Sequence, residues 1–96
     1  MTRKALTEEE LAEVLTTLDG WTINAGKLHK TFKFANFKEA MGWMVAVGMV
    51  AEKMDHHPEW SNVYSRVTVN LVTHDLGNKI GTWDVELARE MNQLAD

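Results

Sequence analysis

The longest uncharged run of the chain, residues 40–51, constrains the fold more than any other feature. It holds 12 residues, against the roughly 20 that a membrane-spanning helix requires, and therefore indicates a buried helix. The run belongs to a longer helical pattern from Phe37 to about Met54, and Asn36 with Glu39 predicts its N-terminal cap. A chain of 96 residues builds only one thin core, so self-association would help to stabilise it.

This helix carries two apolar stripes, which together cover more of its circumference than packing on one small sheet requires. The first stripe consists of Phe37, Met41, Met44, Gly48 and Ala51. The second consists of Trp43, Val47, Val50 and Met54. We expect either a contact between copies of the chain through the second stripe or deep burial of the whole helix within one copy.

The chain before this helix predicts a shorter helix and a β-hairpin. Thr7 and Glu10 have the spacing of a capping box, so we expect a helix over residues 8–18. The turn-forming residues 24–26 separate two strand segments, and apolar residues alternate with polar ones after the turn. The alternating apolar residues are Leu28, Phe32 and Phe34. The hairpin should therefore bury one face.

The chain after the long helix predicts two strands and a last helix. Pro58 ends the long helix because proline disfavours the α conformation of the residue before it. We expect a short strand over residues 60–64, a second strand from Arg66 with alternate residues buried, and a final helix capped by Thr82. This order predicts an α+β fold: a single domain, residues 1–96, with an antiparallel sheet of about four strands and three helices packed on one face.

The composition narrows the classes of function. The chain has 10 Lys and Arg against 14 Asp and Glu, so we expect neither nucleic acid nor a membrane as a direct partner. Because cysteine is absent, disulfides, thiolate metal sites and cysteine nucleophiles are excluded, and histidines and carboxylates remain for any chemistry. The N-terminal segment lacks the apolar run of a secretory signal, so we expect a cytoplasmic protein.

Three of the four histidines lie where the secondary structure is expected to change. His56 and His57 end the long helix and His74 ends a strand, whereas His29 is expected to be solvated in the hairpin. Glu52 lies four residues before His56, so its carboxylate could reach and orient that imidazole. The proline after His57 holds that residue extended, so the two adjacent imidazoles should face different parts of one space.

Each of these residues also has a structural interpretation. Histidines at a helix C-terminus interact favourably with the helix dipole, a histidine at a strand end can bond to backbone, and Asp84 suits a first helical turn. Zinc is a further alternative, because three histidines and a carboxylate are a catalytic zinc ligand set. However, metal-binding histidines on one helix lie four residues apart, whereas adjacent ones diverge. We therefore expect no metal.

The spacing of these residues resembles a known signature. The run Glu52, His56-His57-Pro58, Tyr64, His74 and Asp84 is similar to the signature of the pterin-4a-carbinolamine dehydratases, also called 4a-hydroxytetrahydrobiopterin dehydratases. The resemblance extends to the leading helix, the Gly20-Trp21 approach to the hairpin and the apolar helix, so it covers nearly the whole chain. It departs in the loop before Asp84, which is slightly longer than the Gly-Leu-Thr or Gly-Leu-Ser form of many members, and we expect a different loop shape.

The resemblance implies a reaction and the residues that carry it. The family's substrate is the 4a-hydroxytetrahydropterin left by an aromatic amino acid hydroxylase, the products are quinonoid dihydropterin and water, and no cofactor is implied. Imidazole suits the two proton transfers, since its ordinary pKa of about 6.5 leaves both protonation states accessible at neutral pH. By resemblance, His56 and His74 form the acid/base pair, and His57 holds the substrate near the departing hydroxyl.

The resemblance also implies supporting residues. Those expected to bind substrate or support the histidines are Glu52, Asp55, Pro58, Trp60, Thr73 and Asp84. Glu52 would orient His56, Pro58 would fix the turn, and Trp60 or Thr73 would line the pterin pocket. Asp84 would either orient His74 or complete the last helix.

Assembly and an alternative function follow from the same resemblance. Relatives are commonly dimers or tetramers, so we expect a homodimer or homotetramer through the helix from Phe37 to about Met54 or through a sheet edge. Some members of the family are protein-interaction modules, serving as a dimerisation cofactor or an assembly factor, which gives an alternative from a different class. A third reading is a protein that binds a pterin or another small ligand without catalysis.

Overall fold

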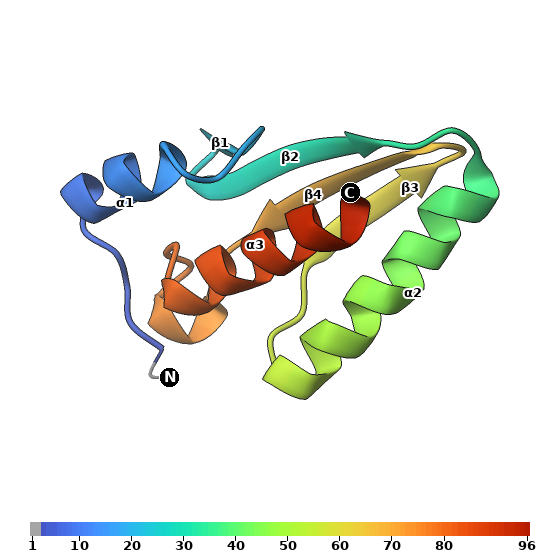
Figure 1. Ribbon diagram of the computed structural model, residues 1–96. Coiled ribbons are helices and arrows are strands. Elements are labelled where there is room, and N and C mark those ends of the chain that lie inside the picture. Colours follow the sequence, from blue (N-terminus) through green and yellow to red (C-terminus); the bar gives the residue numbers. More distant parts are fainter. Residues whose placement is uncertain (1–2) are drawn as a thin grey trace.

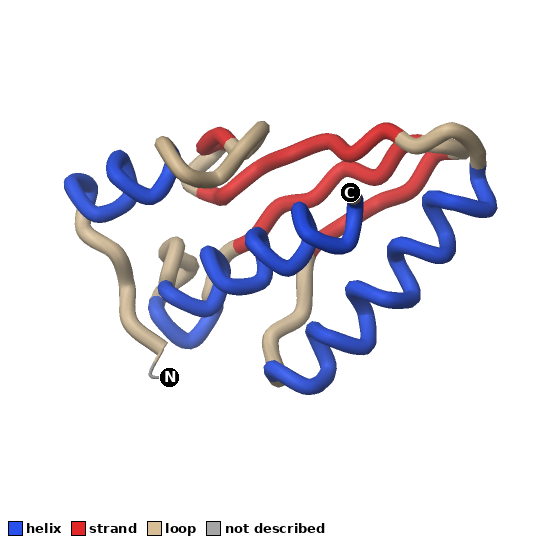
Figure 2. The backbone as a smooth tube through the Cα atoms, viewed as in Figure 1, coloured by secondary structure: helices blue, strands red, loops and turns tan. Residues whose placement is uncertain are grey.

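The computed structural model describes residues 3–96, which contain three α-helices and four strands (Figure 1). In chain order the elements are α1 (Glu8–Leu15), β1 (Thr22–Asn24), β2 (Lys27–Lys33), α2 (Phe37–Met54), β3 (Glu59–Val63), β4 (Arg66–Leu71), a short 3₁₀ helix η1 (His74–Leu76) and α3 (Thr82–Ala95). The strands form one antiparallel sheet in the order β1-β2-β4-β3, and α2 and α3 lie side by side over one face (Figure 2). The predicted fold class is confirmed.

Turn chemistry and side-chain alternation explain the sheet. Ala25 and Gly26 have φ of 52° and 77°, which is the backbone geometry of a tight hairpin turn that matches the twist of its strands. Leu28 on β2 lies opposite Leu71 on β4, so apolar side chains of the two central strands meet on the covered face. The buried side chains of β2 and β4 are Leu28, Phe32, Val67, Val69 and Leu71, as the alternation predicted.

Helix α2 has the predicted length and cap, and Asn36 Oδ1 accepts the Glu39 N–H at 2.9 Å. The predicted division of its apolar stripes is wrong, because Trp43 and Val47 belong to the core. Trp43 anchors this face, since its indole N–H donates to the Met91 carbonyl on α3 at 3.1 Å. The exposed apolar residues of α2 are Phe37, Met41, Val45 and Met49, at 47, 39, 54 and 71% exposure.

Two other predicted helix ends are shifted. Helix α1 has the predicted capping box but ends at Leu15, because the Thr16 and Thr17 hydroxyls donate back to carbonyls of the last turn and the chain leaves the helix there. Helix α3 begins at Thr82, so its N-cap is Gly81 rather than the predicted threonine. No helix among residues 3–96 is long and apolar enough to cross a membrane.

Candidate active site

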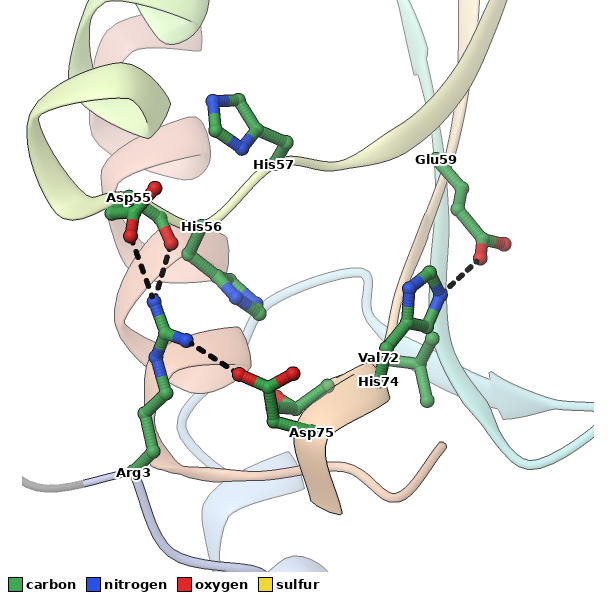
Figure 3. Close-up of a pocket in the computed structure, with 9 residues that line it drawn as sticks. Arg3, Asp55, His56, His57, Glu59, Val72, His74 and Asp75 are labelled. Carbon is green, nitrogen blue, oxygen red and sulfur yellow. Dashed lines mark hydrogen bonds and ion pairs between the residues drawn. The ribbon is translucent and has the colours of Figure 1, made fainter. Parts of the chain in front are cut away.

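A cavity of about 200 Å³ opens where the C-terminus of α2 meets the start of β3 and the end of β4 (Figure 3). Its lining residues are Arg3, Asp55, His56, His57, Glu59, Val72, Thr73, His74 and Asp75. The cavity therefore gathers the three histidines that the sequence singled out. Figure 3 shows His56 and His74 extending toward it from two different segments of the chain.

The backbone turns sharply where α2 ends, and this turn sets the direction of both adjacent histidines. Asp55 takes left-handed backbone angles, with φ of 53°, and the His56 N–H donates to the Ala51 carbonyl at 3.0 Å. This is the helix-ending pattern that glycine usually supplies. Because His56 has left the helix, the expected pairing of Glu52 with His56 is wrong. Glu52 Oε1 instead lies 2.9 Å from His57 Nε2.

His56 is held inside the protein by Asp84. The His56 Nε2 to Asp84 Oδ1 distance is 2.6 Å, and these residues are 7 and 0% exposed. The second carboxylate oxygen of Asp84 accepts the Thr73 hydroxyl at 2.7 Å and the Gly81 N–H at 2.8 Å. Asp84 therefore completes the start of α3, which is one of its two expected roles. The other expected role was to orient His74, whereas Asp84 orients His56.

The contacts of Asp84 also fix the position of the ring proton of His56. Opposite the carboxylate form of Asp84, which only accepts hydrogen bonds, His56 Nε2 is the donor and carries a proton. In the neutral imidazole, Nδ1 is then the acceptor nitrogen. A buried charge held by several hydrogen bonds resists rotation, so the tautomer and the ring orientation are both set by the protein.

His74 has a carboxylate partner of its own. Its Nε2 lies 3.3 Å from Glu59 Oε2, and Lys27 Nζ donates to Glu59 Oε1 at 2.7 Å. The hydrogen bond from Lys27, followed by that from His74, lowers the pKa of Glu59 below its ordinary value of 4.5. Glu59 is therefore a carboxylate throughout the neutral range and faces His74 as a negative charge.

His57 lies at the outer rim of the cavity. Its side chain is 59% exposed and that of Glu52 is 81% exposed, so this pair is much more open to water than His56 with Asp84. Figure 3 shows the His57 ring directed away from His56, as expected for adjacent residues at a helix end. Each of the three imidazoles thus has a different carboxylate partner and a different degree of exposure.

Other residues singled out in the sequence lie outside the cavity. Pro58 leads from the helix into β3 and is half-buried. Trp60 does not line the cavity, because its ring packs on Trp43 with the centroids 6.1 Å apart. Tyr64 follows β3 at the far end of the second hairpin. His29, expected to be solvated, is half-buried with Nδ1 2.9 Å from the side-chain oxygen of Asn70.

Sequence reasoning missed four residues that line the cavity: Arg3, Glu59, Val72 and Asp75. Asp75 adjoins His74 and Glu59 opens β3, so their proximity to histidines offered a weak signal. No signal in the sequence indicated Arg3, because only the folded chain brings it to the cavity. Within residues 3–96, no three His, Asp or Glu side chains gather as ligands of a metal ion.

Comparison with known sequences gives one family. The family model described as Pterin 4 alpha carbinolamine dehydratase matches residues 4–94. A protein of Opitutus terrae is 48% identical over 90 residues, which cover 94% of this chain and 93% of that protein. A protein of Prochlorococcus marinus is 47% identical over 94 residues, covering 98 and 97%. Both are provisionally named pterin-4-alpha-carbinolamine dehydratase.

Comparison with solved structures agrees with the family found by sequence comparison. The transcriptional coactivator/pterin dehydratase from Brucella melitensis has a TM-score of 0.92 and 44% identity, with 97% of this chain and 100% of that chain covered. A pterin dehydratase-like protein described as a RuBisCO assembly factor in the alpha-carboxysome has a TM-score of 0.64 and 20% identity, with 78 and 86% covered. The second likeness is one of fold alone.

Proposed function

The chain belongs to the pterin 4 alpha carbinolamine dehydratase family, and we propose that it dehydrates a 4a-hydroxytetrahydropterin to quinonoid dihydropterin and water. One observation carries the proposal: His56 and His74 line one cavity, and each has its Nε2 on a separate carboxylate. The two Nδ1 atoms are thereby left for proton transfer to and from a substrate. Positioned general acids and bases typically accelerate such steps by about 10² to 10⁴.

The reaction needs two proton transfers at neighbouring atoms of the pterin ring. The bond from C4a to the hydroxyl oxygen breaks, and the lone pair of N5 forms a C4a–N5 double bond in its place. An imidazolium donates a proton to the departing hydroxyl, which leaves as water, and a neutral imidazole accepts the proton of N5. His56 and His74 divide these two tasks, and the proton count balances over one turnover.

The surrounding residues have supporting roles in this proposal. Asp84 positions His56, and Glu59 positions His74 through the contacts described above. His57 lies at the rim, where it would hold the substrate near the departing hydroxyl. Asp55 also lines the cavity, where its exposed carboxylate could accept hydrogen bonds from a pterin. We take residues 1–96 as one domain with this activity.

The dehydration of freshly generated 4a-hydroxytetrahydropterin, followed by ultraviolet absorbance, tests the proposal. Purified protein should accelerate the reaction above its spontaneous rate without an added nucleotide or other cofactor. The matched control is the same concentration of an unrelated acidic protein, which accounts for general buffer catalysis. Folded protein that leaves the spontaneous rate unchanged would refute the enzyme.

The alternative function is that of a protein-interaction module, and one surface favours it. The exposed apolar residues of α2 form a continuous row with four-residue spacing, Phe37, Met41, Val45 and Met49. We propose that this row joins copies of the chain in a homodimer or homotetramer, with the edge strand β3 as the other candidate. The same row could hold a different protein, so the mass of the purified protein separates the two uses.

A further inference from the structure

We propose that Arg3 is a positioning residue for the dehydratase reaction, an inference that rests on the proposed function. Arg3 belongs to the segment before α1, yet its guanidinium group reaches the cavity (Figure 3). Its Nη1 donates to Asp75 Oδ2 at 3.1 Å, and its Nη2 donates to the Asp55 carbonyl. One guanidinium group therefore joins two segments that are distant in the sequence.

The two segments are those that carry the proposed acid/base pair. Asp55 directly precedes His56, and Asp75 directly follows His74. Arg3 therefore contacts the residue next to each proposed acid/base histidine, at the Asp55 backbone carbonyl and at the Asp75 side chain. Figure 3 shows Arg3 in contact with both Asp55 and Asp75. We infer that this bridge sets the spacing between the two rings across the cavity. Acid/base catalysis depends on this spacing, because both imidazoles must reach one substrate together.

Trp83 holds the guanidinium group in place. The central guanidinium carbon lies 4.8 Å from the centre of the Trp83 ring, in the arrangement of a cation–π contact. The Trp83 ring in turn meets the His56 ring edge to face at 6.4 Å. The Arg3 side chain is 29% exposed, whereas those of Asp55 and Asp75 are 90 and 74% exposed. Exposed ion pairs contribute little to stability, so we assign the bridge a geometric role.

Backbone contacts fix the segment that carries Arg3. The Thr82 N–H donates to the Lys4 carbonyl at 2.9 Å, and the Leu6 N–H donates to the Ile80 carbonyl at 3.0 Å. Gly81 lies between these two contacts, and a Cβ there would lie 3.0 Å from the Lys4 carbonyl oxygen. The segment therefore packs closely on Gly81, whose N–H donates to Asp84. Arg3 thus reaches the cavity from a backbone that these contacts hold in place.

Steady-state kinetics of Arg3→Ala, Arg3→Lys and a matched control test this role. We expect Arg3→Ala to lower kcat by roughly 10-fold or more with little change in KM, since misplacement of catalytic groups affects the chemical step. Arg3→Lys should recover only part of kcat, because a compact ammonium cannot bridge both partners as a guanidinium does. Arg89→Ala removes an exposed arginine of α3 outside the cavity and should leave kcat unchanged.

A double variant identifies the path of the effect. If Arg3 acts through Asp75, adding Asp75→Asn to Arg3→Ala should cause no further loss of kcat. Losses that multiply would show that the two residues act separately and would overturn the bridge. Wild-type kcat in Arg3→Ala, or full recovery in Arg3→Lys, would also overturn it.

Histidine ring signals in NMR spectra provide a readout that is independent of catalysis. The ring carbon and proton signals of His56 and His74 should shift in Arg3→Ala and Arg3→Lys and stay in place in Arg89→Ala. Unmoved signals in both Arg3 variants would contradict the positioning role. An inactive wild-type protein would refute the proposed function, and the spectra would still decide whether Arg3 sets the geometry of the two rings.

Discussion

Asp84 Oδ1 lies 2.6 Å from His56 Nε2 in the protein interior, although the two residues are 28 positions apart in the sequence. Thr73 and Gly81 hold the other oxygen of Asp84, so the carboxylate cannot rotate without losing hydrogen bonds. This arrangement gives His56 one orientation and one tautomer, with Nδ1 as the acceptor nitrogen. It is the part of the site that the protein fixes most firmly.

Asp84→Asn should lower kcat by about 10², the magnitude of one general acid or base. The Gly81 N–H requires an oxygen at its position, so the Asn amide nitrogen would face His56 Nε2. Nε2 would then have to accept, and the ring proton would move to Nδ1. The matched control is Asp19→Asn, which changes an exposed carboxylate outside the cavity. Equal kcat values for Asp84→Asn and the wild type would contradict the assigned tautomer.

Metal removal should leave the activity unchanged, because the proposed reaction needs only proton transfer. Prolonged dialysis against a chelator, followed by elemental analysis and the dehydration assay, measures this. Activity that is lost on removal of a stoichiometric metal and restored by its return would overturn the acid/base account.

The ion pair of Lys27 with Glu59 should contribute to stability only above acid pH. The hydrogen bonds from Lys27 and His74 lower the pKa of Glu59 from 4.5. The contribution of the ion pair to stability is therefore present above pH 4.5 and is lost as the pH falls through the lower pKa of Glu59 in the folded state. Both side chains are partly exposed, so Lys27→Met should reduce the free energy of unfolding by less than about 1 kcal/mol at pH 7.

Urea unfolding of the wild type and Lys27→Met across a pH series measures this difference. The two free energies of unfolding should converge as the pH falls below 4.5. A difference that persists undiminished in acid would show that Lys27 stabilises the fold through packing of its alkyl chain rather than through Glu59.

Light scattering should report a mass that is a multiple of 10.9 kDa, because the exposed row on α2 would be buried between copies. A standard interface buries roughly 800 Å² per partner. Met49→Glu should shift the mass toward the monomer while the fold is retained, since Met49 is 71% exposed. Val47→Glu should instead unfold the protein, because Val47 is fully buried. A monomeric wild type at high concentration would refute the assembly.

Local signals in the sequence explain most of the fold. Asn36 with Glu39 and Thr7 with Glu10 form the predicted caps, and the alternation in β4 identifies its buried face. These features depend on residues a few positions apart, so short-range rules describe them. The inward face of α2 could not be found in this way, because both stripes are apolar and the choice depends on how Trp43 packs against α3.

The histidines of the site could be predicted, but their carboxylate partners could not. The expected pairing of Glu52 with His56 assumed that the helix continues to His56, whereas Asp55 adopts the left-handed conformation without being glycine. Asp84 reaches His56 only because α3 returns beside the end of α2. Partners of this kind depend on tertiary packing, which residue spacing does not encode.

The dehydration rate of the double variant His56→Ala/His74→Ala tests the central claim most directly. Circular dichroism and the free energy of unfolding should first show that the variant is folded, because His56 is buried against Asp84. The rate acceleration by the folded double variant should be lower than that by the wild type by a factor of roughly 10² or more. The control His29→Ala, which lies outside the cavity, should keep the wild-type acceleration. Near-normal acceleration by the folded double variant would contradict the assignment of the chemistry to these two imidazoles.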